Sequence, residues 1–146
     1  MKVFVSGFFN RGQQNEYVEL EAASKCSLEG LMLMRYLYGK DYLPIQSETR
    51  VFLFPDINLR KGNLVRVYTF HHAGKKKEKD ETLGKTVYNF SWNLDRTIWE
   101  GKNVEVQVMD SGDSVGLAPY DSTSDSVRIT DDHQVGMLDP DSLLAN

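Results

Sequence analysis

The stretch Asn103-Val104-Glu105-Val106-Gln107-Val108-Met109-Asp110 has valine at every second position of its centre. Successive side chains of a strand point to opposite faces, so Val104, Val106 and Val108 would form one apolar face. This alternation predicts a β-strand that turns one face toward a core. A period of two recurs along most of the chain.

Six further stretches fit strands of ordinary length, separated by polar or glycine-containing turns: residues 2–6, 16–20, 31–38, 49–54, 63–70 and 86–92. Glu16 falls on the same face as Val18 and Leu20, so the alternation is imperfect there. Residues 31–38 are apolar on both faces, which fits either a central strand or a short buried helix. Several short strands without a long amphipathic helix predict an all-β sandwich or barrel.

Length and composition indicate a single globular domain. The chain has 146 residues, of which 40% are hydrophobic and 26% charged, and this is enough to form one core. Cys26 is the only cysteine, which excludes an intramolecular disulfide and a cysteine-rich zinc site and favours a reducing compartment. The apolar stretches are too short for a signal peptide or a membrane span. We therefore expect a cytoplasmic protein without membrane contact, or a secreted one if a signal peptide has been removed.

Charge is distributed unevenly between the two ends of the chain. Residues 1–109 carry 16 Lys and Arg against 13 Asp and Glu, whereas residues 110–146 carry one Arg against eight Asp. From residue 121 onward the composition is poor in large apolar residues, and such a segment buries too little surface to offset its ordering entropy. We expect a folded domain over residues 1–120 and an acidic, largely mobile tail over 121–146, in which residues 126–130 could add an edge strand.

The order and spacing of several fragments resemble the lamin tail domain. Over roughly residues 2–116, the similar fragments are Glu16-Tyr17-Val18-Glu19-Leu20, Leu28-Glu29-Gly30-Leu31-Met32-Leu33, Phe52-Leu53-Phe54-Pro55, residues 59–69, Ile98-Trp99 and residues 104–112. The chain departs from that pattern at Leu31, where an aromatic residue is frequent, in a longer segment from Arg35 to Glu48, and in a Lys-rich loop after Phe70. The resemblance implies an immunoglobulin-like β-sandwich of about seven to nine strands that takes part in protein contacts and in some settings associates with chromatin or DNA.

Within such a sandwich a set of residues is expected to form the structural core. Gly30 would supply the positive φ of a tight turn. Trp99 is expected to lie between the sheets with its indole N–H hydrogen-bonded, whereas Trp92 fits core packing and ligand stacking about equally well. The predicted set is Tyr17, Val18, Leu20, Leu28, Gly30, Leu33, Phe54, Val65, Val67, Trp99, Val104, Val106 and Val108.

Residues with catalytic or metal-binding potential do not form a recognisable motif. His71 and His72 are adjacent and would point to opposite faces of an extended backbone, so they cannot bind one metal together. Asp131-Asp132-His133 has suitable ligand types but lies in the expected tail. Glu16 and Glu19 should point to opposite faces of their strand, which argues against a catalytic carboxylate pair. Cys26 has only Lys25 nearby in the sequence to activate it. We expect no enzyme activity, no cofactor and no bound metal.

The basic segment Gly74-Lys75-Lys76-Lys77-Glu78-Lys79-Asp80-Glu81 is the strongest candidate for binding. Lys75, Lys76, Lys77 and Lys79 would contact phosphates without sequence preference, and Arg60, Lys61 and Arg66 would enlarge the patch if the loops converge. A solvated hairpin tip, in which Glu78, Asp80 and Glu81 neutralise the lysines, is the more ordinary interpretation.

Three functions are compatible with these features. We favour a non-enzymatic interaction or scaffolding module that binds a protein partner of unknown identity through a sheet edge or loop tips. The alternative is a weak nucleic-acid contact through the Lys-rich loop 74–85, and the third is a metal-dependent or enzymatic domain that uses Asp131, Asp132 and His133. We also expect a homodimer through the apolar strand Leu31 to Leu37.

Overall fold

The computed structural model describes residues 2–110, 114–117 and 127–128, and these residues form an all-β sandwich. One short 3-10 helix, η1 (Gln46–Glu48), interrupts the strands. No helix among the described residues is long and apolar enough to cross a membrane. The strands are β1 (Val3–Phe9), β2 (Tyr17–Ala22), β3 (Cys26–Ser27), β4 (Met32–Leu37), β5 (Arg50–Leu53), β6 (Asn58–Leu59), β7 (Leu64–Tyr68), β8 (Lys77–Asp80), β9 (Lys85–Ser91), β10 (Val104–Met109), β11 (Ser114–Leu117) and β12 (Val127–Arg128).

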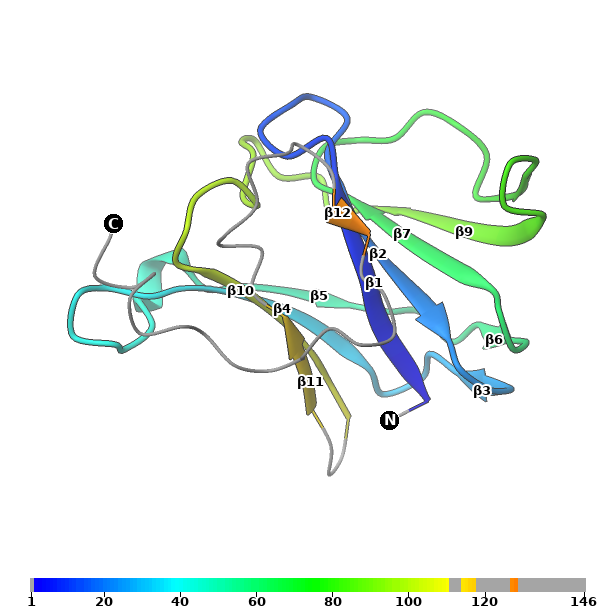
Figure 1. Ribbon diagram of the computed structural model, residues 1–146, viewed down its shortest axis with the longest axis horizontal. Coiled ribbons are helices and arrows are strands. Elements are labelled where there is room, and N and C mark those ends of the chain that lie inside the picture. The colour runs from blue at the N-terminus through cyan, green and yellow to red at the C-terminus, as the bar shows by residue number, and fades with distance from the viewer. Residues whose placement is uncertain (1, 111–113, 118–126, 129–146) are drawn as a thin grey trace.

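Two sheets make up the sandwich, and a small strand pair lies at one end (Figure 1). The six-stranded sheet has the order β12-β1-β2-β7-β9-β8, the four-stranded sheet has the order β11-β10-β4-β5, and β3 pairs with β6. All pairings are antiparallel except that of β7 with β9, which is parallel. The chain must therefore cross from the end of β7 back to the start of β9, and β8 with its flanking loops provides this crossing.

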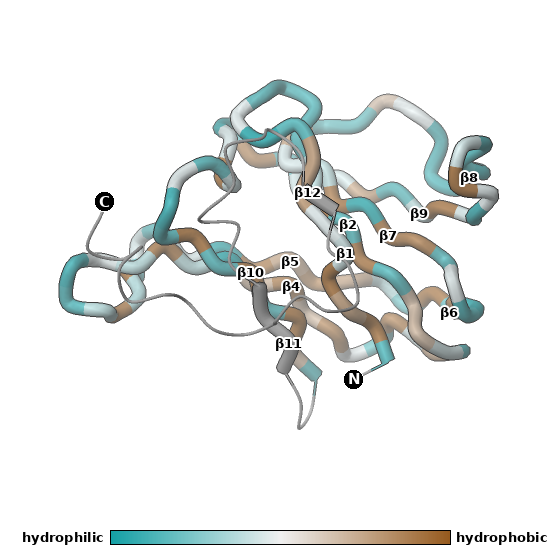
Figure 2. Tube along the Cα trace, viewed as in Figure 1, coloured by the Kyte–Doolittle hydropathy of each residue, from teal (hydrophilic) through white to brown (hydrophobic). Residues whose placement is uncertain are grey.

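The core lies between the two sheets. Figure 2 shows the hydrophobic residues along the strands and hydrophilic residues in the loops that join them. Trp99 is fully buried and lies 5.3 Å from the ring of Phe8 and 6.2 Å from that of Trp92. Its indole nitrogen has no hydrogen-bond partner within the described part of the chain, so the expected partner is not found there.

Most of the predicted core residues occupy the core, and two do not. Eleven of the thirteen are buried. Tyr17 is half-buried on the outer face of the six-stranded sheet, where its ring stacks on Phe9 and packs against Tyr68. The strand alternation places Tyr17 opposite to Val18, so it could not share the core face. Gly30 is exposed in a turn at φ +80°, which is the conformational role expected of it rather than a core position.

Residues 31–38 form a central strand rather than a helix. β4 pairs with β10 on one side and with β5 on the other, and its alternate residues Leu33 and Arg35 are buried. Both backbone edges of β4 are therefore occupied, and a homodimer through this strand would have to use side chains only. The oligomeric state stays a prediction.

A β-bulge in β1 explains why the first strand is longer than its alternation indicates. The register against β2 shifts between Val5 and Gly7. Val3 and Val5 point into the core before the bulge, and Phe8 does so after it. The residues that point inward therefore have odd numbers before the bulge and even numbers after it. At the bulge, the Ser6 hydroxyl donates a hydrogen bond to the Glu19 carboxylate at 2.8 Å.

A buried carboxylate joins three loops at one end of the sandwich. Glu16 is fully buried, on the core-facing side of the chain as its spacing from Val18 indicates. Its carboxylate accepts hydrogen bonds from the Thr69 hydroxyl at 2.6 Å, the Ile98 amide at 2.8 Å and the Gly12 amide at 2.9 Å. A buried carboxylate is tolerated only when donors surround it in this way.

We predict that Glu16→Gln lowers the free energy of unfolding by about 1.5–3 kcal/mol, the range for hydrogen bonds to a charged group. The amide keeps one acceptor oxygen but turns an NH2 group toward at least one of the N–H donors. Urea denaturation of the wild type and the variant would measure the difference. The exposed Glu29→Gln is the matched control, and a loss below about 0.5 kcal/mol for Glu16→Gln would contradict this role for the carboxylate.

Candidate binding surfaces

Half of the Lys-rich segment is a strand and not a hairpin tip. β8 pairs with β9 in the register Lys77 to Tyr88 and Lys79 to Thr86, so these two lysines share a face of the sheet. Glu78 and Asp80 point to the opposite face. There Glu78 accepts a hydrogen bond from Asn89 at 2.5 Å, and Asp80 binds Arg66 at 2.7 Å. Glu78 and Asp80 therefore face away from Lys77 and Lys79, and the neutralisation of the lysines by these acidic residues stays a prediction.

Lys76 lies far along the sheet from the turn that contains Arg60 and Lys61. The turn that contains Arg60 and Lys61 hydrogen-bonds to the end of β2, through the Gly62 amide and the Ala22 carbonyl at 2.8 Å. The β7 to β9 register places this turn level with Lys85, whereas Lys76 lies at the level of Asn89. Four residues of strand separate the two levels, which is about 13 Å along the sheet.

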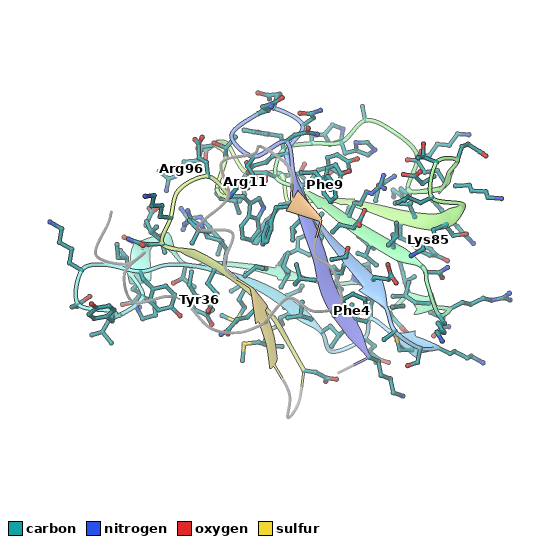
Figure 3. All side chains as sticks on the ribbon, in the orientation of Figure 1. Phe4, Phe9, Arg11, Tyr36, Lys85 and Arg96 are labelled. Carbon is teal, nitrogen blue, oxygen red and sulfur yellow. The ribbon has the colours of Figure 1, made fainter. Side chains whose placement is uncertain are left out.

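The guanidinium group of Arg66 is engaged in two ion pairs within the protein and is not a free contact for a ligand. It contacts Glu19 at 3.0 Å and Asp80 at 2.7 Å, and Glu19 is fully buried. Burial lowers the pKa of Arg66, but the hydrogen bonds to Asp80 and Glu19 outweigh it and raise the pKa overall. The same bond to Arg66 holds the pKa of Asp80 below its usual value. Lys85, labelled in Figure 3, is the first residue of β9 and pairs with Glu21 at 2.9 Å.

An aromatic row crosses the outer face of the six-stranded sheet. Phe9 of β1, Tyr17 of β2 and Tyr68 of β7 lie directly opposite one another on adjacent strands. The ring of His72 stacks on that of Tyr68, with a centroid distance of 4.0 Å and an interplanar angle of 11°. His71, its neighbour, is exposed.

Within the residues that the structure describes, no three His, Cys, Asp or Glu side chains gather in a way that could hold a metal ion. The candidates Asp131, Asp132 and His133 lie outside the described residues.

Cys26 does not have the surroundings of a reactive thiol. It is half-buried on β3 and unpaired. Burial raises the pKa of the thiol, and the nearby charge of Lys2 only partly opposes this. A raised pKa keeps the group as a thiol rather than the nucleophilic thiolate.

A hollow of about 700 Å³ lies where β8 stops pairing with β9. One side is formed by Tyr88, Phe90, Pro55 and Ile57, and the other by the segment that follows β7. The whole lining is Pro55, Ile57, His71, His72, Ala73, Gly74, Lys76, Lys77, Tyr88, Asn89, Phe90, Ser91 and Asn93. The structure thus brings two of the predicted lysines, Lys76 and Lys77, to a concave site that the sequence did not indicate.

Exposed apolar side chains are concentrated at one edge of the four-stranded sheet. Of the six large hydrophobic residues that are exposed in the described chain, five lie between residues 42 and 53. Leu53 is 68% exposed and Leu43 is 61% exposed. The others are Tyr42, Ile45 and Val51, while Leu83 lies apart in the β8 to β9 turn.

Strand β10, on the far side of β4 from β5, carries a buried carboxyl group. Glu105 on β10 accepts hydrogen bonds from the Tyr38 hydroxyl at 3.2 Å and the Gln107 amide at 3.0 Å. Burial raises the pKa of Glu105 in spite of these bonds. Burial, with the adjacent Glu105 charge, also raises the pKa of Tyr38 to about 12.

We predict that Glu105 makes the protein less stable as pH rises above about 4.5, its ordinary pKa. The folded state holds the proton more tightly than the unfolded state, so between the ordinary and the raised pKa the free energy of unfolding falls with pH. Glu105→Gln should flatten this slope. Compared with the wild type, the variant should be more stable at pH 7 than it is at pH 4. Urea denaturation between pH 4 and pH 7 measures how the free energy of unfolding changes with pH, with Glu29→Gln as control. An unchanged slope in Glu105→Gln would refute this role for Glu105.

Comparison with known proteins adds no relative. No protein-family model matches the chain, and no curated protein matches its sequence. The likeness to lamin tail domains is therefore a resemblance of residue pattern. The exposed apolar side chains between residues 42 and 53 and the hollow beside β9 are the two features from which a function can be argued.

Proposed function

We propose that this chain is a non-enzymatic binding module that mediates protein–protein interaction at the apolar edge, by which we mean residues 42–45 and β5. The observation that carries the proposal is the concentration of exposed apolar side chains at this edge. Scattered exposed hydrophobic residues are ordinary on a protein surface, but a contiguous group marks an interaction site.

Residues 42–45 and β5 follow the same side of β4. Tyr38 forms a bridge with Pro44, and the Ile45 amide donates to the Leu37 carbonyl at 2.7 Å. Further along, β5 pairs with Met32 to Arg35 of the same strand. Leu43 and Ile45 therefore lie along the same edge of β4 as Val51 and Leu53, and η1 lies between these two pairs of residues in the chain.

The backbone of β5 is suited to accept another strand. Among the described strands, none pairs with its outer side. Its amide and carbonyl groups could therefore bind an extended segment by strand addition. Lysine commonly protects such edges, yet residues 42–53 contain none. The one arginine, Arg50, directs its guanidinium to the carbonyls of Ser47 and Thr49 at 2.8 and 3.0 Å.

The resemblance to lamin tail domains supports the same proposal. Such domains are immunoglobulin-like sandwiches that make protein contacts, often as accessory domains of larger proteins. An adaptor or self-assembling subunit would be consistent with both the resemblance and the open edge. Fold alone does not establish function, so the exposed side chains carry the argument.

A pull-down with variants of the edge tests the proposal. The purified chain, as wild type and as the double variant V51K/L53K, serves as bait at moderate salt after nuclease treatment. We expect a specific protein to be retained by the wild type and reduced at least about tenfold by V51K/L53K, because lysine at a strand edge opposes pairing. Both positions are exposed, so folding should be preserved.

Leu83→Lys is the matched control, since Leu83 is also an exposed apolar residue but lies away from the edge. It should leave recovery unchanged. Equal recovery by wild type and V51K/L53K would refute the edge as the binding surface. Light scattering of the same samples reports whether the partner is a second copy of this chain.

Nucleic acid binding is the second candidate, because Glu78 and Asp80 are engaged on the opposite face from Lys77 and Lys79. We predict that any affinity for nucleic acid is weak and falls steeply with salt, as few phosphates can be contacted. Replacing Lys75, Lys76, Lys77 and Lys79 with alanine should abolish it in a fluorescence-anisotropy titration with single-stranded DNA. Binding that persists in this variant would contradict a role for these lysines.

A further inference from the structure

We propose that the hollow beside β9 binds a small organic carboxylate with a flat apolar body. This site is distinct from the apolar edge and does not depend on strand addition there. Its volume of about 700 Å³ falls in the usual range for small-molecule sites. Three features of its wall determine the class of ligand.

The first feature is an apolar wall held by packing. The ring of Phe90 contacts Phe52 of β5 and Phe54, which directly follows β5, with ring centroids 6.0 and 5.8 Å apart. Tyr88, Pro55 and Ile57 continue the same wall. Such aromatic and aliphatic surfaces favour a flat hydrophobic body, which would gain stability from the area it removes from water.

The second feature is the sign of the charge around the hollow. Its lining contains two lysines and two histidines, and no aspartate or glutamate. Glu78 of β8 is not part of the lining, and its carboxylate is engaged by the side-chain amide of the lining residue Asn89. The ammonium group of Lys77 lies 5.4 Å from the centroid of the Tyr88 ring, directly beside the apolar wall. An anionic group close to the flat body would therefore meet Lys77 and Lys76 at the rim.

The third feature is that the opposite wall is fastened in place. The His72 amide donates to the Ser91 hydroxyl at 2.8 Å, and the Asn89 amide donates to the Lys76 carbonyl at 2.8 Å. The Asn89 side chain also donates to the Lys75 carbonyl at 2.9 Å. Residues 72–76 thus form an arch joined to β9 at both ends. A preformed hollow loses less entropy on binding than one that must be ordered by the ligand.

Naphthalene-2-carboxylate is a suitable probe, and naphthalene-2-carboxamide is its neutral counterpart. Titration of each into the ¹⁵N-labelled full chain should shift the amide signals of Ile57, Tyr88 and Phe90. We expect the carboxylate to bind roughly fivefold more tightly than the carboxamide, since rim ion pairs are individually weak. K76Q/K77Q should remove this difference, while K75Q/K79Q, which changes exposed lysines outside the lining, should retain it.

Two results would overturn the proposal. Equal affinity of the wild type for the two probes, or no binding of either, would show that the hollow does not select an anion. An equal loss of selectivity in K76Q/K77Q and K75Q/K79Q would show that the attraction comes from the general charge of the segment. Signals that shift instead at Val51 and Leu53 would place the probe on the apolar edge and refute binding in the hollow, without bearing on the proposed protein contact.

Discussion

The carboxylate of Glu16 is the constraint on which the rest of the structure depends. It joins the β1 to β2 loop at Gly12, the end of β7 at Thr69 and the segment before Trp99 at Ile98. These three places are far apart in the sequence. Thr69 and Ile98 are buried, so their donors would otherwise be unsatisfied, whereas Gly12 is exposed. Because Ile98 directly precedes Trp99, the same carboxylate helps to place the largest core side chain between the sheets.

The anchoring at Thr69 also helps to determine where the hollow lies. The Thr69 carbonyl accepts from Leu94 at 2.9 Å and the Tyr68 carbonyl accepts from Trp92 at 2.7 Å, so the ends of β7 and β9 stay together. The chain then leaves the sheet through the arch at 72–76 and returns as β8. The hollow is the space that this return leaves beside β9. The Glu16 carboxylate and the hollow are in this way parts of one arrangement.

The all-β sandwich can be predicted from the sequence because the alternation of apolar and polar residues, as in Val104 to Val108, depends only on local strand geometry. It is insufficient where a strand is irregular or polar. The bulge at Ser6 reverses the alternation of β1, and β8 is too charged to be recognised, since its pairing with β9 supplies the stability. The lysines were identified as candidates, but the hollow was not, because Pro55, Ile57 and Tyr88 meet only through long-range packing.

The apolar edge is energetically different from the core. Side chains such as Leu53 remain exposed, so in the isolated chain they contribute little to the free energy of folding. A partner that covered them would gain about 25 cal/mol for each Å² removed from water, in addition to the backbone hydrogen bonds of an added strand. By contrast, Phe52 on the inward side of the same strand packs against Phe90 and Trp92. The two faces of β5 therefore differ: the inward face stabilises the sandwich, and the outward face is the exposed surface that we propose for contact with a second molecule.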